Sequence, residues 1–204
     1  MVQERRKPIQ VRGKEKVDLI LNAAKELIGE RGNDAVSMRE IAKECGIAPS
    51  SIYQYFPDKN AILEAIMAEY YGKFSEIMDS GFSNMVDFPS YAKAVDKGLD
   101  QFYKMFKDEP LLATIWSSVQ ANTVLREMDI QDSKEKAEAM TKKQCSIFPK
   151  LKRKDVYDTN FLFAHMMGST VRLSLTVGNT EGKRLIKELK QLIVLRIESL
   201  LVDA

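Results

Sequence analysis

The chain has 204 residues, of which 45% are hydrophobic and 29% are charged, so it can bury a sizeable core, and its formal net charge of +2 does not by itself indicate a nucleic-acid partner. No segment approaches the ~20 uninterrupted apolar residues of a membrane span, and the charged N-terminus lacks the apolar run of a signal peptide. Cys45 and Cys145 lie far apart and form no CxxC pair, which argues against a disulfide framework or a cysteine-rich metal site and suits the reducing cytoplasm.

The first sixteen residues are basic. They carry six cations against Glu4 and Glu15, namely Arg5, Arg6, Lys7, Arg12, Lys14 and Lys16. A basic arm can lie along DNA phosphates or in the minor groove. The alternative is a solvated terminus, and the two are compatible because such arms can become ordered on binding.

The first helix is predicted over residues 14–30, followed by Gly32 as a stop signal. Its apolar side chains recur at helical spacing at Val17, Ile20, Leu21, Ala24, Leu27 and Ile28. The helix is therefore expected to pack one stripe against the elements that follow.

Residues 37–59 predict two short helices joined by a tight turn, followed by the start of another helix. Ser37 and Glu40 form a capping box, and Gly46 can adopt the left-handed conformation that ends the first helix. Pro49 suits the first turn of the second helix, whose inward residues are Ile52 and Phe56. The pattern is that of a helix-turn-helix with polar and aromatic side chains turned outward. The alternative is an ordinary helical hairpin.

This stretch resembles the DNA-binding domain of the TetR family of bacterial transcription regulators, and the resemblance covers about the first 80 residues at the level of motifs. The matching positions are Ser37, Ile41-Ala42, Gly46-Ile47, Ile52-Tyr53, Tyr55-Phe56 and Lys59. The resemblance implies that the second helix of the motif lies in the major groove of DNA, braced by its neighbours.

Side-chain chemistry suggests a role for each outward residue of this motif. Ser37 and Lys59 suit phosphate oxygens. Gln54 is the best candidate for base readout because its amide can pair with adenine, whereas Arg39 can reach a phosphate or a guanine edge. The remaining candidates for DNA contact are Pro49, Ser50, Ser51, Tyr53 and Tyr55. The two tyrosine hydroxyls would reach phosphates, unless one of the rings packs in the core.

Three positions depart from the family pattern. Ala48 stands where a serine or threonine usually caps the second helix, Pro49 where a lysine is common, and Tyr55 where a histidine is common. The reading helix therefore carries no cation. We expect moderate DNA affinity with a salt dependence of about three to five phosphates per subunit.

The rest of the chain also reads as helical, so the predicted fold class is all-α, with a helix-turn-helix domain over 1–58 and a ligand-binding and dimerisation domain over 59–204. The helices are expected over 58–79, 90–106, 111–116, 120–146 with a break near 129–133, 155–177 and 180–202.

The last two helices are apolar over most of their surface, which a two-fold dimer would cover as a four-helix bundle. The alternative is complete burial within one chain. The dimer is favoured because two copies on a palindromic operator double the number of bases that are read. The expected interface consists of Ala164, Gly168, Val171, Leu189, Ile193 and Ile197.

The resemblance further implies that the second domain binds a small-molecule effector that changes the separation of the two DNA-binding heads. The candidate pocket wall is Met67, Tyr71, Phe102, Phe106, Trp116, Gln120, Phe163, His165 and Met166. Such side chains favour an apolar or amphiphilic ligand, although core packing is the simpler explanation for each. His165, the single histidine, is expected to be a hydrogen-bonded core residue.

No motif indicates an enzyme, a cofactor or a metal site, because the sequence has one histidine and no glycine-rich phosphate loop, GxSxG or HExxH. The predicted function is a DNA-binding repressor released from its operator by a small ligand. The alternative is a DNA-binding protein controlled by a protein partner. A closed apolar cavity would favour the ligand, and an exposed apolar patch on residues 90–146 without a cavity would favour the partner.

Overall fold

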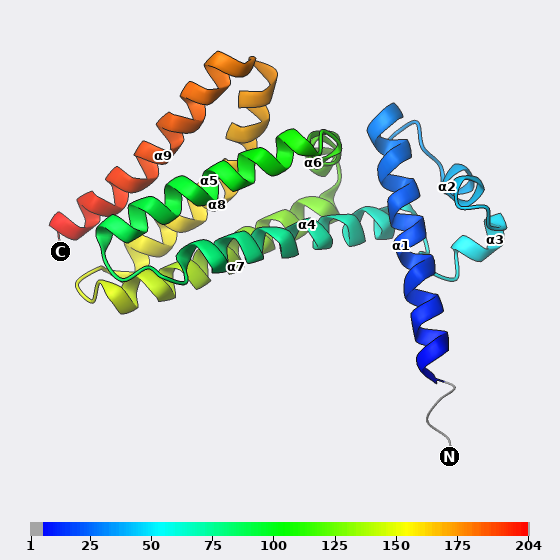
Figure 1. Ribbon diagram of the computed structural model, residues 1–204, viewed down its shortest axis with the longest axis horizontal. Coiled ribbons are helices and arrows are strands. Elements are labelled where there is room, and N and C mark those ends of the chain that lie inside the picture. The colour runs from blue at the N-terminus through cyan, green and yellow to red at the C-terminus, as the bar shows by residue number, and fades with distance from the viewer. Residues whose placement is uncertain (1–5, 204) are drawn as a thin grey trace. The chain divides into compact units, whose positions relative to one another are not determined.

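The computed structural model describes residues 6–203, except for the side chains of residues 6–12 and 118–121. This part of the chain is helical and contains no strand, so the predicted all-α fold class is confirmed (Figure 1). The helices are α1 (Arg6–Arg31), α2 (Met38–Glu44), α3 (Pro49–Ile52), α4 (Lys59–Phe82), α5 (Phe88–Asp108), α6 (Leu111–Ala121), α7 (Thr123–Ile147), α8 (Arg153–Thr176) and α9 (Asn179–Val202).

The chain divides into two compact units. The first contains the described residues up to Tyr70 together with Pro110–Leu125, and the second contains Tyr71–Glu109 and the described residues from Arg126 onward. The first unit thus extends beyond the boundary expected at residue 58. It gains the start of α4 and also α6, which sequence periodicity could not assign to it.

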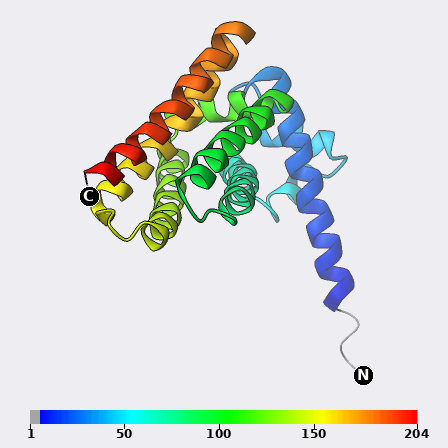
Figure 2. The same cartoon turned by 60° about the vertical axis from the view of Figure 1, so that its left-hand side comes forward.

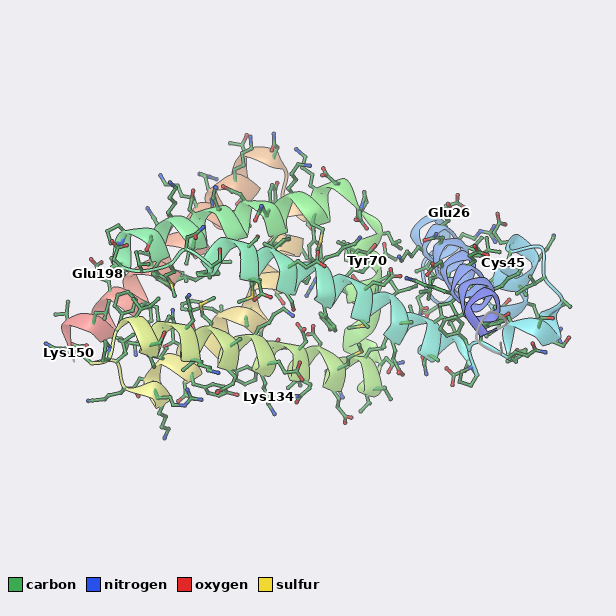
Figure 3. All side chains as sticks on the ribbon, turned by 60° about the horizontal axis from the view of Figure 1, so that its bottom comes forward. Glu26, Cys45, Tyr70, Lys134, Lys150 and Glu198 are labelled. Atoms are coloured by element: carbon green, nitrogen blue, oxygen red, sulfur yellow. The ribbon has the colours of Figure 1, made fainter. Side chains whose placement is uncertain are left out.

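The first unit is built around α1, which packs against α2 and α6. Its core is formed by Ile20, Ala24, Ile28, Ile41, Ala42, Ile52, Ile62 and Ile66, all fully buried. Figure 3 marks Cys45, which follows α2, and its half-buried thiol lies 3.7 Å from the Leu19 carbonyl oxygen on α1. The thiol therefore packs partly within the unit, where a free cysteine behaves as a small hydrophobic side chain.

The helix α1 begins at Arg6, eight residues before the predicted start at Lys14. The stretch expected to precede the helix as a basic arm is therefore its first turns from Arg6 onward. Arg5 lies outside the described residues, as do the side chains of Arg6, Lys7 and Arg12.

The second unit contains the end of α4 with α5, most of α7, and the antiparallel pair α8 and α9, which lie side by side in Figures 1 and 2. The helix α5 packs against both α8 and α9. Their common core includes Tyr91, Val95, Leu99, Val156, Leu189 and Ile197. Gly182 near the start of α9 is buried against the Ser174 backbone of α8, so no side chain fits between the two helices there.

The break predicted near residues 129–133 is absent, because α7 continues through them. The interruption lies at Asn122 instead, between α6 and α7. There the Asn122 side chain accepts a hydrogen bond from the Leu125 amide at 3.2 Å, as a helix cap does. Among the residues that the structure describes, no helix has both the length and the apolar character needed to cross a membrane.

Candidate functional site

A complete capping box fixes the start of α2. The Glu40 amide donates to the Ser37 hydroxyl at 3.3 Å, while the Ser37 amide and hydroxyl donate to the Glu40 carboxylate at 2.9 and 2.8 Å. These bonds from Ser37 lower the pKa of Glu40. The stabilisation from the capping box is therefore complete above the usual pKa range of a carboxyl group, and it is lost as the pH falls through the lowered pKa. Ser37 can therefore bind a phosphate with its hydroxyl only by giving up its bond to Glu40.

The turn after α2 is held by backbone hydrogen bonds. Gly46 has φ +63°, and its amide donates to the Lys43 carbonyl at 3.0 Å while the Ile47 amide donates to the Ala42 carbonyl at 3.0 Å. This pair of bonds is the Schellman motif, which closes a helix with a left-handed glycine. The motif sets the direction in which the chain leaves α2 toward α3.

The reading segment is a four-residue helix, α3, extended by a tighter turn. Its N-cap, Ala48, makes no side-chain hydrogen bond, and Pro49 occupies the first turn. Beyond Ile52 the amides of Gln54 and Tyr55 bond three residues back, at 3.2 and 3.0 Å. The segment therefore follows the predicted course to Phe56, but its second half is a tight turn and not an α-helix.

Most of the predicted DNA-contacting side chains lie on the surface of the first unit. Arg39, Pro49, Ser50, Tyr53, Gln54 and Tyr55 are exposed, and Ser51 is half-buried. Tyr53 and Tyr55 are 52% and 36% exposed, so neither ring belongs to the core. Ile52 and Phe56 are buried and anchor the segment from below. The arrangement presents neutral hydrogen-bonding groups together with the Arg39 guanidinium.

Lys59 has a structural role that its position in the motif did not suggest. Its half-buried ammonium donates to the carbonyl oxygens of Asn33 at 2.6 Å and Val36 at 3.0 Å. These carbonyls belong to the loop between α1 and α2. Lys59 therefore ties α4 to the loop that positions α2.

Replacing Lys59 by methionine should lower the free energy of unfolding by about 1–3 kcal/mol, because two carbonyls lose a charged donor. The slope of log affinity for DNA against log salt should not change, because the ammonium acts within the protein. Urea unfolding and salt titrations measure the two quantities, with Lys134→Met at an exposed position of the second unit as the control. A slope smaller by about 0.9 would instead identify Lys59 as a phosphate contact.

The second unit contains a partly open cavity of about 100 Å³ between α4, α5, α7 and α8, with one side chain from α9. Its lining is Phe74, Ile77, Met78, Phe82, Tyr91, Val95, Gly98, Leu99, Phe102, Lys136, Ala137, Met140, Asn160, Phe163, Ala164, Met167 and Ile193. Ala164 and Ile193, expected in the dimer interface, thus face the inside of the subunit. The sequence did not single out Tyr91, Lys136 or Asn160.

Of the predicted pocket residues, Phe102 and Phe163 line this cavity. Met67 and Trp116 are buried in the first unit, and the Gln120 side chain lies outside the described residues. Phe106 packs against the rings of Phe74 and Phe102. Met166 is exposed, and so is His165, with 42% of its side chain accessible, which corrects the expectation of a core histidine because its position on α8 turns it outward.

A polar cluster lies beside the cavity. The Tyr71 hydroxyl donates to Asp129 at 3.0 Å, and burial, with Asp129 adding to it, raises the pKa of Tyr71. Lys136 pairs with Asp132, and its ammonium lies 5.3 Å from the centre of the Tyr71 ring. Burial raises the pKa of Asp132 although Lys136 opposes this effect. Each buried charge of the cluster named here thus has a partner of opposite charge or a hydrogen-bond donor.

The pair α8 and α9 exposes a row of apolar side chains. We call the set Leu162, Met166, Leu173, Val177, Leu192, Leu195 and Val202 the α8–α9 face. On each helix its members recur at three- and four-residue steps (allowing for one turn without a member), so they share one side. Val171, Leu189 and Ile197, predicted to form the interface, are instead buried within the subunit and unavailable to a partner. Gly168 is half-buried.

The comparisons with known proteins agree with this geometry. Residues 20–66 match the family described as "Bacterial regulatory proteins, tetR family", and residues 89–198 match "Tetracyclin repressor-like, C-terminal domain". The chain is 42% identical over 67 residues to the HTH-type transcriptional regulator YuxN of Bacillus subtilis, covering 32% of this chain and 23% of the relative. It is also 42% identical over 50 residues to the HTH-type transcriptional regulator UidR of Escherichia coli, covering 24% and 26%.

The chain thus matches only about a quarter of the length of these curated relatives. Solved structures are similar over nearly the whole chain. The fatty acid degradation regulator FadR from Bacillus halodurans superposes with a TM-score of 0.69 at 22% identity, covering 88% of this chain and 94% of that one. A TetR-family regulator from Streptomyces coelicolor gives 0.66 at 19% identity, covering 91% and 99%. At these identities the likeness concerns the fold alone.

Among the residues described, no group of three or more histidine, cysteine or acidic side chains could hold a metal ion.

Proposed function

Because the chain belongs to the TetR family of DNA-binding bacterial transcription regulators, we propose that it represses transcription as a homodimer on a palindromic operator and is released by a small molecule bound in its second unit. The exposed polar side chains on α2, on α3 and in the turn that follows α3 are the observation that carries the proposal. The protein would act in the cytoplasm, without a cofactor and without enzymatic activity.

The residues of the DNA-reading surface are proposed to have different roles, which follow from the chemistry of their side chains. Gln54 pairs with an adenine edge, and Ser50 and Ser51 contact bases or phosphates. Arg39, Tyr53 and Tyr55 contact phosphates and fix the register. Since α3 itself contains no cation, few phosphates are neutralised, and affinity should depend on having two copies of the motif.

Dimerisation is proposed through the α8–α9 face. A contiguous exposed apolar surface is costly for a protein that remains a monomer, and burying it between two copies would form a four-helix bundle. The buried faces of the same helices already hold the subunit together. The two sides of each helix therefore serve different purposes, one inside the subunit and one between subunits.

The cavity supports control by a small ligand. An effector acts by binding one arrangement of the protein more tightly than the other, by about 1–3 kcal/mol or more. The alternative, control by a protein partner, would call for an exposed apolar patch on α5–α7. Among the described residues of these helices, the exposed large apolar side chain is Val124. The apolar cavity and the lack of such a patch among these residues favour the ligand.

Selection of genomic fragments by the purified protein, followed by footprinting, tests the proposal. A specific repressor should enrich an inverted repeat and protect both of its halves at equal protein concentration. Weak binding to all fragments, removed by modest salt, would refute a specific operator. Release of the footprint by an extract fraction of small molecules, but not by its protein fraction, would support control by a ligand.

Changing Gln54 to alanine should relax the base preference at one position in each half-site, with a loss of about 1–3 kcal/mol of discrimination there. The side chain is exposed, so the fold should be unaffected. Binding to a library of operator variants measures the effect, and Gln131→Ala, on the exposed side of α7, is the matched control. An unchanged preference at every position would show that Gln54 does not read bases.

A further inference from the structure

The cavity of the second unit has a polar end, and the rest of its described wall is apolar apart from Lys136. Tyr91 on α5 and Asn160 on α8 both line it, among phenylalanine, methionine and aliphatic side chains. On α7, the lining residues Ala137 and Met140 are followed one turn later by Gln144 on the same side of the helix. Gln144 is fully buried. A glutamine in this place is unusual because burial of an amide is costly unless it is fully bonded.

The hydrogen bonds at this end leave two amide atoms unused. The Asn160 amide nitrogen donates to the Thr141 hydroxyl at 2.9 Å and to the Gln144 carbonyl oxygen at 2.7 Å. Both donors of Asn160 are therefore engaged, and its carbonyl oxygen makes no hydrogen bond within the described residues. The Gln144 amide nitrogen is buried and no acceptor there meets it in good hydrogen-bond geometry, although the Tyr91 hydroxyl is near enough for the Gln144 side chain to lower the pKa of Tyr91. The Asn160 carbonyl oxygen on the cavity wall, and the Gln144 amide nitrogen just behind that wall, are thus left for a molecule inside the unit.

The charges around the cavity are already neutralised. Lys136 is the one charged residue in the described lining, and its ammonium is bound to Asp132. An anion that took Lys136 would leave the largely buried Asp132 carboxylate without its partner, and a cation would face the Lys136 ammonium. Burial raises the pKa of Tyr91, so its hydroxyl remains uncharged at neutral pH. The lining of the cavity thus disfavours both anionic and cationic ligands.

The size of the cavity limits the ligand further. At about 100 Å³ it is smaller than the ~150 Å³ engineered cavity that holds benzene, so a compact molecule fills it after a small expansion.

We propose that the effector of this regulator is a compact, uncharged, mainly apolar molecule with one hydroxyl group, of the phenol or small alcohol class. The hydroxyl oxygen accepts from the Gln144 amide nitrogen and its proton is donated to the Asn160 carbonyl oxygen, while the apolar body contacts the surrounding rings and methionines. This inference rests on the proposed control by a small ligand and specifies its chemistry.

Calorimetric titration of the protein with four related probes tests this ligand class. Phenol should bind about ten-fold more tightly than benzene, because one well-formed hydrogen bond contributes about 1 kcal/mol or more. Benzoate and benzylammonium should bind at least ten-fold more weakly than phenol. Equal or tighter binding of either ion, or no binding by any of the four probes, would overturn the inference, and this series requires no variant.

The variant Gln144→Leu tests the contact itself. It should reduce phenol affinity to that of benzene while leaving benzene binding nearly unchanged. Gln131→Leu is the matched control, since Gln131 is exposed, one turn before Lys134, which Figure 3 shows on the outside of α7. A phenol-to-benzene ratio that is the same in Gln144→Leu and in the unaltered protein would overturn the assignment.

A parallel measurement of operator release separates the two proposals. If phenol binds as expected but no small molecule releases DNA, the cavity assignment holds and ligand control fails. If another molecule releases DNA while phenol is not bound, ligand control holds and the proposed ligand class fails.

Discussion

Leu195→Arg should convert the protein to a monomer and reduce its affinity for a palindromic operator by about 100-fold or more. Leu195 belongs to the α8–α9 face and is 58% exposed within the subunit, so the arginine can be accommodated without disturbing the core. In a two-fold interface the substitution places two like charges in an apolar contact. Each head would then bind alone, and the gain from tethering two heads would be lost.

Light scattering after size-exclusion chromatography measures the oligomeric state, and fluorescence anisotropy measures operator binding. Val86→Arg is the matched control, because Val86 is also an exposed apolar residue, 73% accessible, but lies in the loop before α5. It should remain dimeric with unchanged operator affinity. A stable Leu195→Arg dimer would remove the α8–α9 face from the interface.

Gly182→Ala should destabilise the second unit by about 3 kcal/mol, which for a chain of this length lowers the melting temperature by roughly 6–12 °C. A Cβ atom at Gly182 would lie 2.8 Å from the Ser174 carbonyl carbon and closer still to its oxygen. Because both atoms belong to the backbone of α8, no side-chain rotation can relieve the overlap. The α8–α9 pair must separate, which also disturbs the α8–α9 face.

The same substitution at Gly72 should have the opposite effect and increase the stability of the protein. Gly72 lies inside α4, is exposed, and a Cβ there would meet nothing within 4 Å. Alanine should therefore stabilise the helix by about 0.5–1 kcal/mol. Calorimetric melting of both variants makes the comparison, and a Gly182→Ala variant as stable as the unaltered protein would contradict the close approach of α8 and α9.

Features governed by neighbouring residues were predictable from sequence. The capping box of Ser37 and Glu40 and the left-handed turn at Gly46 are present as predicted, because each depends on residues a few positions apart. Lys59 is different. Its bonds to the carbonyls of Asn33 and Val36 join positions more than twenty residues apart, and no local pattern marks a carbonyl as an acceptor.

The periodicity of the sequence could not predict which sides of α8 and α9 face the core of the subunit. Both helices carry apolar residues on more than one side, so the sequence does not show which side packs within the subunit. Val171 and Ile197 are fully buried, whereas Leu173 and Leu195, two positions away in each case, are more than half exposed. The polar end of the cavity was missed for a related reason. Asn160 and Gln144 meet only after α7 and α8 have packed.

The turn at Gly46 is held by hydrogen bonds between backbone groups alone, so the DNA-reading residues that follow it can be replaced by other amino acids. Since the direction of α3 is set by amide and carbonyl groups, the exposed side chains of Ser50, Tyr53 and Gln54 make no hydrogen bond within the described residues that the fold requires. New operator sequences can therefore be sought by randomising these three positions while the caps and the second unit stay fixed. The motif is in this sense a modular platform, suited to building regulators that keep one effector and recognise different promoters.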